Sequence, residues 1–261
     1  MRNFLIRILQ ALLLLAVASS FAHADNFMYF KKKAAGGASC SPTTGDELTE
    51  GFESLSGSSG YEANVGTWTQ TGSTIDNQAT LAGSPPSNSC TKGINFSVVD
   101  AAAAKSVWDR GSTLARATTT DIVFDLYITS ITFDDDFENS HIFLWANNAT
   151  GGSALGKIQL YRTGATYNLR ARNSDDSSTA TLVPVSTETW YTVTIHFEST
   201  TSEAYFQVVG GGSTVCDTAG ECKYTRTDTA DPRYLIFGVM DGMDAGDSLN
   251  MTFGYVRINT P

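Results

Sequence analysis

The chain has 261 residues, of which 27 are acidic and 17 are basic, so its formal net charge at pH 7 is -10. This excess of negative charge argues against binding to the backbone of a nucleic acid. The length suits one large β domain, because no linker divides the body of the chain.

The first two dozen residues have the three-part layout of a secretory signal peptide. A short basic stretch precedes the apolar run Ile8–Val17, and Ala22-His23-Ala24 has the small-x-small form of a cleavage site. The apolar run is too short to span a bilayer, so we expect no membrane span in the mature chain. We therefore expect residues 1–24 to be removed and the protein to be secreted, either outside the cell or into a periplasm.

Residues 25–49 show no hydrophobic period and contain a Gly/Ala cluster, so we expect a flexible linker or tether there. From residue 50 to 261 the sequence consists of short runs of alternating apolar residues, separated by Gly, Ser, Asn and Asp. These runs are rich in Thr, Val, Ile, Tyr and Phe, which favour strands. The expected strands are Val65–Thr71, Ser73–Leu81, Ile94–Val98, Asp121–Thr129, His141–Ala146, Leu155–Arg162, Thr166–Arg172, Thr179–Val183, Trp190–Glu198, Glu203–Val209, Tyr234–Met240 and Leu249–Ile258.

About a dozen strands with turn signals between them indicate a single all-β sandwich or barrel. The one helix-like stretch is Val99–Ser106, which contains four consecutive alanines. The alternation places Ile122, Phe124, Leu126 and Ile128 on the core side of one strand, and Tyr191, Val193, Ile195 and Phe197 on the core side of another. In the last strand the apolar phase changes, which predicts a β-bulge near Gly254–Tyr255.

All four cysteines, Cys40, Cys90, Cys216 and Cys222, follow the expected cleavage site. An even number in an exported chain favours disulfides over metal ligation. Three pairings are open. We favour Cys216–Cys222, because these two residues flank a tight loop, and Cys40–Cys90 by elimination.

Four stretches in order suggest a family. They are GFESLSGSSGYEANVGTWTQTGS, the hairpin KIQLYRTGATYNLRARN, the Trp-Tyr hairpin TETWYTVTIHFESTTSEAYFQVV, and the closing segment YLIFGVMDGMDAGDSLNMTFGYVRIN. Together they resemble the concanavalin A-like lectin/glucanase superfamily in its laminin-G-like form, over roughly Glu50 to Pro261. The resemblance implies an antiparallel jelly-roll sandwich of two curved sheets, with carbohydrate held on the concave sheet in many members and plain adhesion or packing in others.

The same resemblance allows two kinds of enzyme to be considered. Laminarinase-type hydrolases carry an ExDxE pattern that puts three carboxylates on one strand face, and this sequence has none. Asp134-Asp135-Asp136 with Glu138 falls in a polar turn without that period, so we interpret it as a solvated acidic loop first and a calcium site second. The strings RxEL, QxH and YxKxGxYNQ of alginate-lyase-type members are also missing. We therefore predict no catalytic residue.

A polar ligand-binding face is still expected. Gln159 shares one side of its strand with Tyr161, and Arg170 shares one side of the next strand with Arg172. We predict that these four residues, together with His141 and Trp145, contact a ligand. Flat aromatic rings can stack on sugars while Arg and Gln hydrogen-bond hydroxyls. The alternative to ligand binding is that the polar residues form a solvated face and that Trp145 lies in the core.

A structural calcium ion is a second expectation. DGMDAGD places Asp241, Asp244 and Asp247 in one Gly-rich loop, where hard oxygen ligands could gather, with Glu53 or Asp134 added from elsewhere. The competing interpretation is an ordinary acidic turn. It is favoured by Gly254, which stands where calcium-binding relatives often have an Asp.

The sequence thus predicts a secreted, non-catalytic module that binds glycan, such as a cell-surface polysaccharide, or another surface partner. The alternatives are a polysaccharide-active enzyme, more plausibly a lyase than a hydrolase, and a structural module of an extracellular assembly. Nothing in the sequence indicates a nucleic-acid face.

Overall fold

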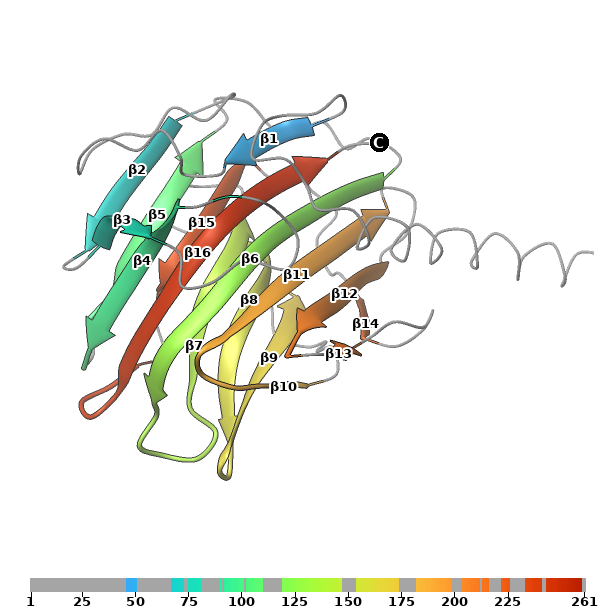
Figure 1. The fold of residues 1–261 in the computed structure, drawn as a ribbon. Coiled ribbons are helices and arrows are strands. Elements are labelled where there is room, and N and C mark those ends of the chain that lie inside the picture. Colours follow the sequence, from blue (N-terminus) through green and yellow to red (C-terminus); the bar gives the residue numbers. More distant parts are fainter. Residues whose placement is uncertain are drawn as a thin grey trace, which may run out of the picture.

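The computed structural model describes residues 46–50, 67–72, 75–80, 90, 92–100, 102–109, 119–146, 154–173, 182–198, 203–211, 213–215, 222–225, 233–240 and 243–259. These residues form strands and connecting turns, with no helix among them, and the strands make two curved sheets (Figure 1). The expected signal peptide and most of the expected tether lie outside this part of the chain. In the described residues, no helix has the length and apolar character needed to cross a membrane.

Within the described residues, the first sheet has nine strands, all paired antiparallel where the register is known. Its main path runs β13 (Ser213–Val215), β12 (Glu203–Gly210), β11 (Thr189–Glu198), β6 (Thr119–Thr132), β16 (Ser248–Asn259), β4 (Lys92–Val99) and β3 (Ile75–Thr80). Two short strands extend it, β1 (Asp46–Glu50) beside β16 and β14 (Lys223–Thr225) beside β12. Because β1 pairs with β16, residues 46–49, which end the expected tether, belong to the sheet together with Glu50.

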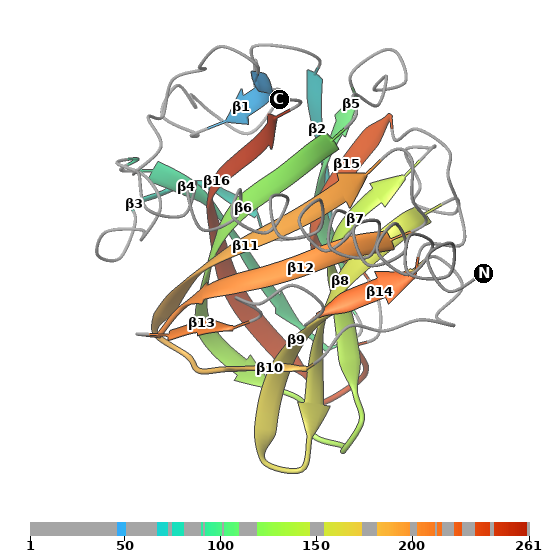
Figure 2. The ribbon, with the colours of Figure 1, turned by 90° about the vertical axis from the view of Figure 1, so that its right-hand side faces the viewer.

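The second sheet has seven strands in the part of the chain that the structure describes. Their order is β10 (Val183–Val185), β9 (Thr166–Asn173), β8 (Ala154–Thr163), β7 (Asn139–Ala146), β15 (Tyr234–Val239), β5 (Ala104–Asp109) and β2 (Thr67–Gly72). Consecutive strands alternate between the sheets only in part, since β7, β8 and β9 form a meander within the second sheet. The two antiparallel sheets pack face to face as a jelly-roll sandwich, which confirms the predicted fold class (Figure 2).

The core lies between the two sheets. Ile122, Phe124, Leu126 and Ile128 of β6 all point into it and are at most 1% exposed, as the alternation predicts. Tyr191, Val193 and Ile195 of β11 also point into the core and are at most 5% exposed, while the side chain of Phe197 lies outside the described part. Aromatic rings join the sheets, because Phe124 of β6 stacks on Phe143 of β7 with ring centroids 4.4 Å apart.

Two local predictions have opposite outcomes. The pairing of β16 with β6 shifts register between Phe253 and Tyr255, so the predicted bulge is confirmed. The helix-like interpretation of Val99–Ser106 is wrong: β4 ends at Val99, the chain turns at Asp100, and β5 begins at Ala104. The helix propensity of the alanines is lost to strand pairing, since β5 hydrogen-bonds to both β15 and β2.

Several connections gather at one end of the sandwich. The β6–β7 turn, the β8–β9 hairpin and the β15–β16 loop all lie at the lower end in both views (Figures 1 and 2). The end of β4 is tied to the same region, because the backbone N–H of Asp100 donates to the carbonyl of Asp247 at 2.8 Å. This end is called the loop end below.

Candidate functional site

The outer face of the seven-stranded sheet is polar over β7, β8 and β9. In β8, Ile158 and Leu160 face the core, and in β9, Leu169 and Ala171 do so, so the intervening side chains point outward. This surface is called the polar face, and its members are Asn139, His141, Lys157, Gln159, Tyr161, Asn168, Arg170 and Arg172.

Strand register sets these residues next to one another. His141 of β7 lies opposite Gln159 of β8, which in turn lies opposite Arg170 of β9. Tyr161 and Lys157 occupy the neighbouring outward positions of β8, and Lys157 lies opposite Arg172. Five of the six predicted ligand residues, all except Trp145, are therefore brought together on one face.

A chain of contacts connects three strands across this face. The Gln159 amide, 2% exposed, donates from Nε2 to Oδ1 of Asn139 at 2.9 Å and accepts at Oε1 from Nε of Arg170 at 2.8 Å. The Arg170 guanidinium also lies over the Tyr161 ring, 3.7 Å from its centroid. Both polar ends of Gln159 are thus bonded, one to Asn139 and the other to Arg170. The guanidinium and the phenol are left half-buried at the surface.

Next to the polar face the same side of the sheet becomes apolar. Leu144 of β7 and Ile236 of β15 form a small cluster separate from the main core, and Tyr234 and Met240 pack against it. The outer side of the seven-stranded sheet therefore carries polar groups over β8 and β9, and over β15 a buried apolar pair with the half-buried Tyr234 and Met240 packed against it.

Trp145 does not belong to this face, which corrects the prediction. Its side chain is 2% exposed and lies in the main core, opposite Gly156. A regular strand would place His141 and Trp145 on the same side, but the pairing of β7 with β8 shifts register between His141 and Phe143. The bulge turns His141 outward and Trp145 inward. No sequence signal marked it.

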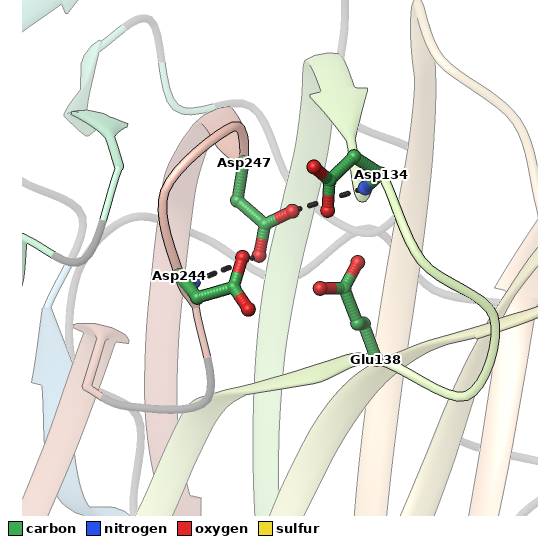
Figure 3. A group of neighbouring side chains, drawn as sticks. All are labelled: Asp134, Glu138, Asp244 and Asp247. Atoms are coloured by element: carbon green, nitrogen blue, oxygen red, sulfur yellow. Dashed lines mark hydrogen bonds between the residues drawn. The ribbon is translucent and has the colours of Figure 1, made fainter.

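A second group of functional side chains lies at the loop end. Asp134 and Glu138 come from the β6–β7 turn, and Asp244 and Asp247 come from the β15–β16 loop (Figure 3). One carboxylate oxygen from each of the four lies within 4.8 Å of the others. These four residues are called the acidic cluster. Carboxylate oxygens from flexible loops are the ligands that calcium prefers, so the donor set suits a hard divalent cation.

Asp247 fastens the two loops together. Its side chain is fully buried, and its carboxylate accepts from the backbone N–H of Asp134 and from that of Asp244, each at 3.1 Å. Gly246 lets the β15–β16 loop approach the β6–β7 turn closely, because its φ is +117° and a Cβ there would lie 2.5 Å from Oδ2 of Asp134. Asp100 adds a further tie by accepting from the Gly246 N–H at 3.0 Å.

Desolvation, and then the closeness of the other carboxylates, raises the pKa values of Glu138 and Asp244. Partial burial raises the pKa of Glu138, the backbone N–H of Asp135 lowers it by hydrogen bonding, and the charges of Asp247, Asp244 and Asp134 raise it further. The pKa of Asp244 is raised by desolvation and then by Asp134, Asp247 and Asp135. A bound cation would offset this mutual repulsion.

The predicted metal residues are only partly within the described structure. Asp244 and Asp247 come together with Asp134, whereas Asp241 and Glu53 lie outside the described residues. Glu138 also joins the cluster, although the sequence favours a solvated acidic loop there over a calcium site. Of the acidic run in the β6–β7 turn, only Asp134 is expected from the sequence beside DGMDAGD, because no local pattern shows that the two loops meet.

Two cysteines can be placed. Cys90 and Cys222 are 4% and 3% exposed, and neither is a free thiol. Cys40 and Cys216 lie outside the described residues, so the favoured pairing stays a prediction.

Comparison with known proteins supports the fold. No family model matches the sequence, and no curated protein matches it significantly. Cellulose-induced protein Cip1 is 10% identical with a TM-score of 0.50, over 82% of this chain and 98% of that one. Trypanosoma rangeli sialidase, solved with sialic acid, is 12% identical with a TM-score of 0.50, over 84% of this chain and 31% of that one.

Botulinum neurotoxin type C, whose cell entry depends on two ganglioside molecules, is 11% identical with a TM-score of 0.45, over 74% of this chain and 42% of that one. The chain thus spans about two fifths of that structure's length. At such low identity these likenesses concern architecture alone. The two antiparallel sheets described above establish a jelly-roll sandwich, and the two structures with a TM-score of 0.50 agree with that fold.

Proposed function

We propose that this protein is a carbohydrate-binding module and that its ligand lies on the polar face. The observation that supports this most is the contact chain Asn139–Gln159–Arg170–Tyr161, which presents a fixed guanidinium and a half-buried phenol at the surface. Sugars need directed donors and acceptors for their hydroxyls and aromatic surface for their C–H faces. The polar face offers both, and its key cation is held before a ligand arrives.

A second candidate function, elimination on a uronate-containing polysaccharide, is favoured by one arrangement. Tyr161 touches Arg170, and His141 lies opposite Gln159 on the adjacent strand. In such a reaction Arg170 would neutralise the uronate carboxylate, and Tyr161 or His141 would transfer the proton. The same groups suffice for binding alone, so we place binding first.

Calcium is proposed as a structural ion rather than a reactant. The acidic cluster would hold it, and its charge would relieve the repulsion that raises the pKa values of Glu138 and Asp244. Its effect would be to fix the loop end beside the polar face.

Export of the protein is proposed from the leader sequence. Secretion, outside the cell or into a periplasm, would give the oxidising setting in which the favoured Cys40–Cys90 and Cys216–Cys222 disulfides form. The N-terminal segment would then serve as a tether.

The test is a binding screen on immobilised glycans with two matched variants. Arg170→Met removes the guanidinium of the polar face, and Arg257→Met removes an equally half-buried Arg from the outer face of the other sheet. We expect Arg170→Met alone to lose glycan binding. Equal binding by both variants, or no retention of any glycan by the unmodified protein, would overturn the proposal.

The same samples decide between binding and elimination. Incubation with uronate polymers is followed by ultraviolet absorbance of unsaturated products. A steady increase with the unmodified protein would replace the binding proposal by the lyase.

A further inference from the structure

Phe137 is an aromatic side chain exposed at the tip of the β6–β7 turn. It is 64% exposed, and within the described residues the one other large hydrophobic side chain so open to solvent is Val99, at 61%. Its backbone has a φ of +71°, a conformation that glycine and asparagine adopt far more readily than an aromatic residue. A residue that is strained and contributes little burial has no evident packing role, and such positions are typical of ligand contacts.

Hydrogen bonds on both sides hold this turn in place. The N–H of Asp135 donates to Oε2 of Glu138 at 2.9 Å, and the N–H of Arg162 donates to the carbonyl of Glu138 at 2.9 Å. Asp136 accepts from the N–H of Gly164 at 2.6 Å, which ties the turn to the β8–β9 hairpin. Phe137 is therefore displayed on a fixed support.

The ring of Phe137 continues the polar face. Its centroid lies 6.4 Å from that of Tyr161, with the two ring planes inclined at 40°, and the Arg170 guanidinium lies over Tyr161 on the polar face. From Tyr161 the half-buried outward groups continue through Arg170 to Arg172 of β9, which are about 7 Å apart along the strand at 3.3 Å per residue, whereas Gln159 and Lys157 are buried beneath this surface. The two rings and the two guanidinium groups thus form one row that is longer than a single sugar ring.

We propose that Phe137 and Tyr161 form an aromatic platform for one pyranose ring of an extended glycan that crosses from β9 over β8 and leaves the sheet over the β6–β7 turn. This inference rests on the proposed function and adds that the ligand is a chain of several sugars rather than a single terminal sugar. A pyranose offers a C–H face to the rings and hydroxyls at its edge to the neighbouring polar groups. A lipid surface fits less well, because the turn also carries Asp134, Asp135, Asp136 and Glu138, whose charges would repel anionic headgroups.

Affinity electrophoresis first shows which of alginate, laminarin and carboxymethylcellulose retards the protein most. The probe is then a series of fragments of that polysaccharide, from monosaccharide to hexasaccharide. Affinities of the unmodified protein, Phe137→Ala, Phe137→Tyr and Val99→Ala are measured by calorimetry, after thermal unfolding has shown that each variant is folded. We expect Phe137→Ala to weaken hexasaccharide binding about tenfold, equivalent to about 1.4 kcal/mol, and to leave the shortest bound fragment unaffected. Phe137→Tyr should retain the affinity, and Val99→Ala should change nothing.

The outcomes separate the two proposals. Hexasaccharide binding that Phe137→Ala leaves unchanged, or that Val99→Ala weakens equally, overturns this inference while the proposed function stands. Affinity that does not grow with fragment length also overturns it. Failure of the unmodified protein to bind any of the three polysaccharides overturns both.

Discussion

Replacing Asp247 by alanine should loosen the loop end even when no cation is present. The buried carboxylate accepts hydrogen bonds from the backbone N–H groups of Asp134 and Asp244, each at 3.1 Å, and so joins the β6–β7 turn to the β15–β16 loop. Alanine leaves both donors without this acceptor. The substitution also removes one negative charge from the acidic cluster, which works in the opposite direction.

The size of the effect follows from these two terms. A hydrogen bond to a charged group contributes about 1.5–3 kcal/mol, so the two together contribute about 3–6 kcal/mol, and relief of the carboxylate repulsion offsets part of it. We expect the free energy of unfolding to fall by about 2–4 kcal/mol. For a domain of this size, that lowers Tm by about 5–15 °C. The assay is thermal unfolding followed by circular dichroism in excess chelator at neutral pH.

Asp135→Ala is the matched control. Asp135 is exposed on the same turn, its backbone N–H bond to Glu138 survives the change, and its charge raises the pKa of Asp244. Its removal should leave Tm unchanged or slightly higher. If Asp247→Ala unfolds at the same temperature as the unmodified protein in chelator, the fastening role assigned to Asp247 is wrong.

Two further predictions concern the acidic cluster and the core. Glu138 and Asp244 have pKa values raised in the folded state, so their contribution to stability is present below their ordinary pKa values and is lost as pH rises through the raised ones. In chelator, Tm should therefore fall between mildly acidic and neutral pH, and calcium at about a hundredfold excess over its Kd should restore about 2.7 kcal/mol at neutral pH. A Tm indifferent to calcium would refute the proposed ion. Gly156→Ala places a Cβ 2.0 Å from the Trp145 ring and should cost about 1–3 kcal/mol in urea unfolding; a neutral result would contradict the core position of Trp145.

The sandwich could be predicted from the sequence because its strands alternate in a regular way. Inward positions such as Phe124 and Val193 were correct, since each repeats the period of two that a half-buried sheet imposes. The bulge in β16 was predictable for the same reason, because the apolar phase itself changes near Tyr255. In β7 the apolar residues continue through the bulge, so the sequence shows no phase change and Trp145 was misplaced.

Long-range contacts explain the other differences. The alanines before β5 favour a helix locally, and pairing with β15 and β2 overrides that preference. Asp134 and Asp247 are 113 residues apart, so their meeting depends on the order of strands in both sheets and on no local pattern. The exposure of Phe137 likewise depends on a turn conformation, and nothing in FDDDFENS indicates its positive φ.

The most direct test of the central claim is a chemical-shift map of the backbone amides during titration with the polysaccharide fragment that binds best. The account predicts that the perturbed amides lie in β7, β8 and β9, around residues 139–141, 157–161 and 168–172, and extend to Phe137 with longer fragments. Perturbations confined to the nine-stranded sheet, around residues 121–125 and 192–196, would contradict it.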